Sequence, residues 1–123
     1  MNNDKEKFKN EFKQKLYRWV LKLLRFVDEL PKKDSVSRIL GDQLIRSGTS
    51  ILSNYVEAHS SSSKRDFAHY FRTSLRSANE SKVWLALLRD IKRGEQEEIN
   101  DSLKKLQEIA AILASSLITL KKK

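Results

Sequence analysis

The side chains best suited to catalysis or metal binding are an amide and two carboxylates, Asn54, Glu57 and Glu80. Paired carboxylates can transfer protons or hold metal ions, but helical bundles with two metal ions use Glu-x-x-His pairs on facing helices. This sequence contains no such pair. His59 follows Glu57 by two positions, so their side chains would leave a helix in different directions, and His69 is ten residues further on. We therefore expect no metal ion and no other cofactor.

The usual signatures of a nucleophile or a phosphate-binding loop are also missing. No Gly-x-Ser-x-Gly turn is present, and Gly41, Gly48 and Gly94 are too scattered to form a glycine-rich loop. We predict that the protein is not an enzyme. An enzyme or small-molecule binder that uses the three polar residues above is the least favoured alternative.

Basic residues are better placed for binding. The chain carries 25 Lys and Arg against 16 Asp and Glu, a net charge of +9. Such an excess attracts RNA or DNA, although it can also serve only to keep a protein soluble. Arginine suits phosphate because its guanidinium group matches two phosphate oxygens. The predicted nucleic-acid-binding residues form two groups, Arg65, Arg72 and Arg76 in one, and Arg18, Lys22 and Arg25 in the other. The alternative is a solvated face whose arginines pair with Asp66 or Glu80.

The elements that must position these residues are helices. Only three glycines and one proline occur in 123 residues, too few for a many-stranded sheet. Apolar residues recur at three- and four-residue steps in four segments, at about 5–30, 35–60, 64–93 and 96–121. Ser63 and Asp66 are spaced as a capping box, and Gly94 is the expected C-terminal cap of the third segment. We predict one all-α domain over residues 1–123, an antiparallel up-down-up-down four-helix bundle.

Some apolar residues fall outside the stripes that would form the core of this bundle. They lie on the outer sides of the first and second predicted helices, where one subunit would leave them in water. The alternative is a thick bundle in which these side chains tuck against neighbouring helices. We predict that they form the interface of a homo-oligomer; they are Tyr17, Leu21, Leu24, Ile45, Leu52 and Val56.

The sequence gives no indication of export or of membrane insertion. The first residues are polar, and no run of about 18 apolar residues exists. The absence of cysteine fits a reducing compartment. We expect a cytoplasmic protein without a membrane partner.

Four segments of the sequence are similar to those of a known family. They read QLIRSGTSI at 43–51, NYVEA at 54–58, SSKRDF at 62–67 and LRSANE at 75–80. Together they resemble the signature of the four helix bundle protein family, first noticed as open reading frames in intervening sequences of bacterial large-subunit ribosomal RNA genes. That family is related to the accessory variability determinant proteins of diversity-generating retroelements. The resemblance runs from about residue 17 to residue 93 and weakens in the fourth helix.

The resemblance implies a homopentameric, barrel-like ring with basic surfaces. The retroelement relatives bind nucleic acid and a reverse transcriptase. The family's recurrent polar positions match residues of this chain, which we interpret, together with Gln43, as a structural polar network: Arg46, Asn54, Glu57, Ser77 and Glu80. Many members have proline and glycine where this chain has Leu52 and Ala58, which implies a straighter, longer second helix here.

Two functions from different classes follow from these features. The first is a nonenzymatic oligomeric scaffold that binds RNA or DNA through basic helix faces, largely independently of sequence. The second is a module that contacts another protein, or an accessory subunit of a separate enzyme, with no affinity of its own for nucleic acid.

Overall fold

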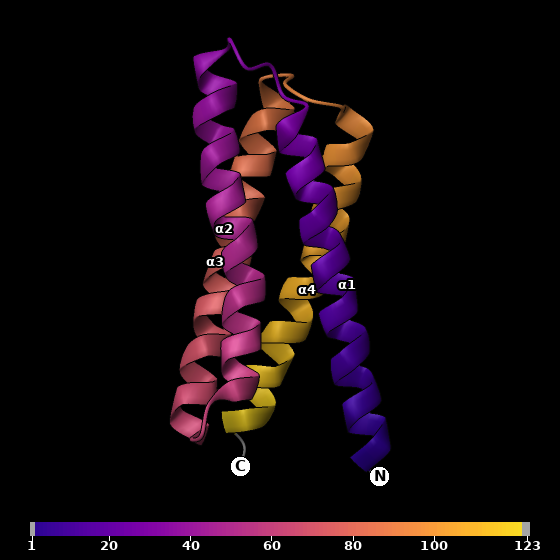
Figure 1. Ribbon diagram of the computed structural model, residues 1–123, viewed down its shortest axis with the longest axis vertical. Helices are drawn as coiled ribbons and strands as arrows, with labels where there is room; N and C mark the ends of the chain where they lie inside the picture. The colour runs from indigo at the N-terminus through magenta and orange to yellow at the C-terminus, as the bar shows by residue number, and fades with distance from the viewer. Residues whose placement is uncertain (1, 122–123) are drawn as a thin grey trace.

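The computed structural model describes residues 2–121 and consists of four helices. They are α1 (Asn2–Asp28), α2 (Ser35–Ser60), α3 (Lys64–Asp90) and α4 (Gln96–Lys121). They run up, down, up and down, and the N-terminal half of α1 diverges from the other three helices (Figure 1). Helices α2 and α3 pack along most of their length, whereas α1 contacts α4 much less closely. The predicted all-α four-helix bundle is confirmed.

The end of α3 differs from the prediction. The helix stops at Asp90 rather than at Arg93, because Lys92 adopts the left-handed conformation with φ 62°. The Arg93 N–H donates to Leu88 O at 2.9 Å, and the Lys92 N–H donates to Arg89 O at 3.1 Å. These two hydrogen bonds define a Schellman motif. Gly94 is also left-handed, with φ 84°, but it lies beyond the cap that it was expected to provide.

The N-terminal ends of α2 and α3 are held in different ways. Ser63 caps α3, because its hydroxyl oxygen accepts a hydrogen bond from the backbone N–H of Asp66 at 3.1 Å. Asp34 lies at the start of α2, but its carboxylate accepts from the Ser37 hydroxyl and from Arg93 Nε, both at 2.6 Å. These partners hold the pKa of Asp34 below its usual value, Ser37 being the larger cause. Asp34 thus ties the start of α2 to the turn after α3.

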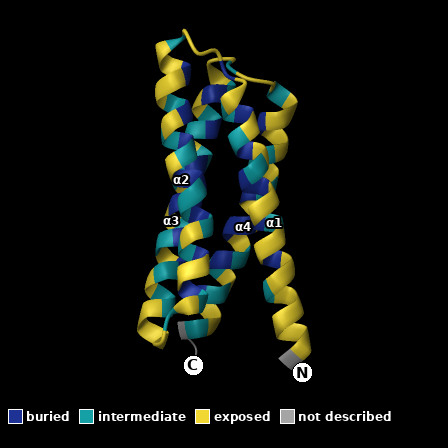
Figure 2. Ribbon diagram, in the orientation of Figure 1, coloured by how far each residue is buried: buried dark blue, intermediate teal, exposed yellow. Residues whose placement is uncertain are grey.

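The core lies along the bundle axis, where buried residues from all four helices face one another (Figure 2). Every helix contributes fully buried large side chains, among them Leu16, Leu44, Leu85 and Leu106. Val36 keeps step with the apolar residues of α2, so helical period predicts it in the core, but it is 46% exposed while the adjacent Ser37 is buried.

Small residues let neighbouring helices approach α2 closely. Towards α3, the Ser74 hydroxyl donates to the Ile51 carbonyl at 2.8 Å, and the hydroxyls of Ser47 and Ser81 lie 2.7 Å apart. Towards α1, a Cβ atom at Gly48 would overlap the Leu23 side chain. Burial of a hydroxyl group destabilises the fold little when the group has a hydrogen-bond partner. The contacts of α2 therefore combine close packing with satisfied polar groups.

Candidate nucleic-acid interface

Three arginines on α3 give the chain an unbalanced positive surface. Arg65, Arg72 and Arg76 are exposed, and none of them takes part in an ion pair within residues 2–121. The expected neutralising partner Glu80 pairs with Arg46 instead. Asp66 makes no ion pair there either. The alternative in which these acids neutralise the α3 arginines is therefore not observed.

Two of the three α3 arginines line a shallow hollow between α3 and α4. Lys64, Arg65 and Arg72 line it on the α3 side, and Leu117 and Leu120 line it on the α4 side. Arg76 lies one turn beyond Arg72. Basic and aliphatic side chains thus line the same hollow, so a nucleic acid that bound there would meet cations for its phosphates and apolar groups for its sugars or bases.

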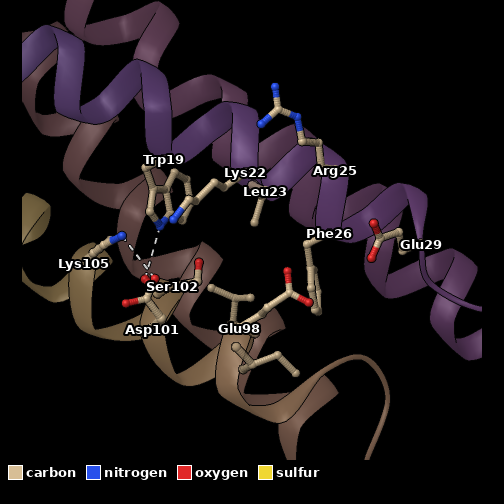
Figure 3. Close-up of a pocket in the computed structure, with 12 residues that line it drawn as sticks. Trp19, Lys22, Leu23, Arg25, Phe26, Glu29, Glu98, Asp101, Ser102 and Lys105 are labelled. Carbon is tan, nitrogen blue, oxygen red and sulfur yellow. Dashed lines mark hydrogen bonds and ion pairs between the residues drawn. The ribbon is translucent and has the colours of Figure 1, made fainter.

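The second predicted group lies elsewhere. Arg18, Lys22 and Arg25 are exposed on α1, and α1 and α3 do not pack directly against each other in the described part of the chain. Lys22 and Arg25 line a cavity of about 290 Å³ between α1 and α4. In Figure 3, Lys22 points towards Trp19, whereas the guanidinium group of Arg25 points away from α4. The six predicted residues thus form two sites on different sides of the bundle.

The cavity between α1 and α4 is mixed in charge. Glu29, Glu98 and Asp101 line it together with Lys22, Arg25 and Lys105. Asp101 pairs with Lys105 at 3.1 Å (Figure 3). These acids would repel a polyanion, so the α3 arginines should attract nucleic acid more strongly than the α1 group does.

Sequence reasoning missed this cavity. Its floor includes Trp19, whose indole Nε1 donates to the Ser102 carbonyl at 3.1 Å. The periodicity of α1 correctly marks Trp19 as a core residue, but periodicity carries no information about the space left between α1 and α4.

The predicted polar network is present as two separate clusters. In the first, Arg46 donates to Gln43 Oε1 and pairs with Glu80, whose carboxylate also accepts from Trp84 Nε1 at 3.2 Å. Both clusters lie across the seam between α2 and α3, which suits a role in fixing helix register.

In the second cluster, Asn54 donates to Ser50 Oγ, which also accepts from Ser77, each at 2.9 Å. Glu57 is exposed and makes no side-chain hydrogen bond within residues 2–121, which corrects its assignment to the network. Asn54, Glu57 and Glu80 are therefore not joined into one site.

Two of the predicted interface residues are brought together by the structure, since Leu24 of α1 and Ile45 of α2 line one hollow between these helices. Tyr17 is 49% exposed and Val56 is 37% exposed, while the other four members are half-buried. Leu24 and Leu52 also pack against the core. Part of this set therefore follows the alternative of a thick bundle, and part remains open to a partner.

His59 sits in an aromatic cluster near the C-terminal end of α2. The rings of Tyr55, Phe67 and Phe71 surround it, with centroids 4.6 to 5.9 Å away. Its Nε2 is buried without a hydrogen-bond partner among the described residues. Burial lowers the pKa of His59, and the nearby charge of Lys9 adds to the effect. Burial also raises the pKa of Tyr55 to about 12.

This setting predicts a pH-dependent stability. Because the pKa of His59 is lower in the folded than in the unfolded chain, the unfolded chain takes up the proton first as the pH falls below 6.5. The free energy of unfolding should therefore decrease between pH 7 and pH 5.5, as measured by urea denaturation. His59→Gln should flatten this slope, whereas His69→Gln, at an exposed position, should keep it. An unchanged slope in His59→Gln would contradict the assignment.

No helix among residues 2–121 is both long enough and apolar enough to span a membrane.

Comparison with known proteins agrees with the resemblance noted in the sequence. The family model of 23S rRNA-intervening sequence proteins matches residues 9–115, which extends the similarity into α4. The structure is similar to a crystal structure from Bacteroides thetaiotaomicron, a protein with unknown function from the S23 ribosomal protein family. The TM-score is 0.76 at 29% sequence identity, and the similarity covers 86% of this chain and 97% of that chain. No curated protein matches the sequence.

Proposed function

Because the chain belongs to the 23S rRNA-intervening sequence protein family, we propose that it is a nonenzymatic, self-assembling helical bundle that binds nucleic acid through its basic helix faces. Neither the family nor its solved member brings an assigned activity. The proposal therefore depends on this chain's own surface chemistry.

The observation that carries the proposal is the set of exposed α3 arginines without acidic partners among the described residues. An exposed arginine that is already paired with a carboxylate must break that ion pair to bind phosphate. The lost ion pair offsets part of the binding free energy of the new phosphate contact. Arg65, Arg72 and Arg76 have no such cost within residues 2–121. They share one arc of α3, so a single phosphate backbone can contact all three.

Self-assembly would strengthen this surface. In a cyclic oligomer each α3 face is repeated once per subunit, so one polyanion can contact several copies at once. The family resemblance implies five copies. Partly exposed apolar residues such as Tyr17 and Val56 support association, because contact between subunits would remove them from water.

Contacts of this kind would recognise phosphate rather than base sequence. The chain carries no helix-turn-helix or zinc-finger pattern that would place side chains in a groove. Affinity should therefore be similar for unrelated sequences and should fall steeply with salt.

Fluorescence anisotropy with labelled 20-nucleotide RNA and 20-base-pair DNA, titrated at 50 to 300 mM salt, tests the proposal. We expect binding at 50 mM salt with little dependence on base sequence, and a linear fall of log K with log salt. Absence of binding at 50 mM salt would favour the second function, a module that contacts another protein.

A further inference from the structure

His69 lies among the three arginines that form the proposed nucleic-acid-binding surface of α3. Positions 65, 69, 72 and 76 are separated by four, three and four residues, so at 100° per residue they fall within about 60° around the helix. All four side chains are exposed. Ser74, which is fully buried, lies about 180° from Arg65. Arg65, His69, Arg72 and Arg76 therefore form one stripe on the side of α3 opposite the core, which we call the α3 stripe.

The imidazole ring of His69 does not hold the bundle together in the described part of the chain. Within residues 2–121 the ring takes part in no hydrogen bond or ion pair, and only the backbone carbonyl of His69 accepts from a side chain, the Thr73 hydroxyl at 3.1 Å. His59, in contrast, is enclosed by three aromatic rings of the bundle. The ring of His69 is thus available to a ligand.

The ring of Tyr70 supports His69 from one side. The two ring centroids lie 5.3 Å apart, and the ring planes meet at 66° in a T-shaped pair. Tyr70 itself is half-buried and packs against the core. In a T-shaped pair the edge of one ring meets the face of the other, so Tyr70 covers at most one face of the imidazole. At least one face of the His69 ring remains uncovered by Tyr70.

A flat ring between arginines can bind a base while the arginines bind phosphates. The bases of a single strand can turn outwards and stack on aromatic rings, including that of histidine. The bases of a duplex are already paired and stacked on one another, so they cannot reach such a ring. The α3 stripe is about 16 Å long at 1.5 Å per residue, which is enough to contact several nucleotides of one strand.

We propose that the α3 stripe binds single-stranded nucleic acid in preference to a duplex, with a base stacked on His69 and the neighbouring phosphates bound by the three arginines. The inference rests on the proposed function and specifies the form of the nucleic acid. Phosphate contacts alone would not give this preference, because a duplex carries the higher density of charge. Stacking of one base should raise the affinity for a single strand about tenfold, whatever the base.

Variants of His69 separate base stacking from phosphate contact. His69→Ala removes the ring, whereas His69→Phe keeps a flat ring that carries no charge. Asn79→Ala, at an exposed position about 40° from Arg65 around α3, is the matched control. Fluorescence anisotropy at about 100 mM salt compares four labelled probes of equal length: single-stranded RNA and DNA of one sequence, the DNA duplex of that sequence, and an abasic strand that keeps the phosphates without bases. Circular dichroism checks that each variant is folded.

We expect the unmodified chain, Asn79→Ala and His69→Phe to bind both single strands about tenfold more tightly than the duplex and the abasic strand. His69→Ala should lose this difference and keep its affinity for the duplex. A difference between the RNA and DNA strands would show which sugar the site prefers, with both still above the duplex.

The inference would be overturned if the unmodified chain bound the duplex as tightly as the single strands. It would also be overturned if His69→Ala kept its affinity for single strands, or lost affinity equally for single strands and duplex. In these three cases the proposed function would stand, because binding through phosphates would remain. Binding of none of the four probes would overturn the proposed function together with the inference.

Discussion

Reversing the charge of the three α3 arginines is expected to weaken nucleic-acid binding about 100-fold at about 100 mM salt. The variant Arg65→Glu, Arg72→Glu, Arg76→Glu removes three phosphate contacts and adds three repulsive charges. Each lost contact also removes a released counterion, so the slope of log K against log salt should become shallower by about 3. Anisotropy titrations at several salt concentrations measure both quantities.

A charge-matched variant separates local contacts from net charge. Lys7→Glu, Lys33→Glu, Lys104→Glu changes the net charge by the same amount at exposed positions on other elements. We expect it to lower affinity only a few-fold and to leave the salt slope nearly unchanged. Equal losses in both triple variants would mean that binding depends on overall charge and that α3 provides no defined surface.

The second large effect is expected at Gly48, where the Leu23 side chain of α1 packs closely against α2. A Cβ atom there would overlap the buried Leu23 side chain and lie 3.4 Å from Trp19 Cζ3. The branched side chain of Gly48→Val therefore cannot fit unless the buried Leu23 side chain is displaced or α1 moves outwards. Overpacking of this kind costs about 3 kcal/mol, which outweighs the small gain in helix propensity. Urea denaturation followed by circular dichroism measures the loss.

Gly41→Ala provides the matched comparison on the same helix. Its added Cβ atom would meet the Val27 and Leu30 side chains at 3.0 and 3.5 Å, a much milder approach. Because alanine favours a helix over glycine by about 1 kcal/mol, the two effects should nearly cancel. If Gly48→Val were as stable as Gly41→Ala, the close approach of α1 to α2 would be contradicted.

The sequence predicted what depends on helical period. Leu16, Leu44 and Leu85 repeat in step with their helices, and they are fully buried. The start and end of α2 were also predicted correctly, because Pro31 and the serine run bound that segment. The local sequence is enough to predict which residues of a helix are buried and where the helix begins and ends.

The remaining features depend on how whole helices are placed. The α1/α4 cavity depends on how the side chains of these two helices meet. Val36 is exposed although its neighbour Ser37 is buried, and Glu57 is separated from Glu80 because Glu80 meets α2 at Arg46, eleven positions before Glu57. The left-handed Lys92 was missed because Gly94, two residues later, is the residue that sequence rules favour for that conformation. Which residue after α3 adopts the left-handed conformation is decided by the packing around the turn.

The most direct test of the account is the mass of the purified chain by light scattering, with and without a short nucleic-acid duplex at low salt. The account predicts an assembly of several subunits, five by the family resemblance, each of 14.3 kDa. Its mass should rise by that of at least one duplex when nucleic acid is added, and should return to the original value at high salt. A mass of 14.3 kDa that does not change when the duplex is added would contradict both the assembly and the basic binding surface.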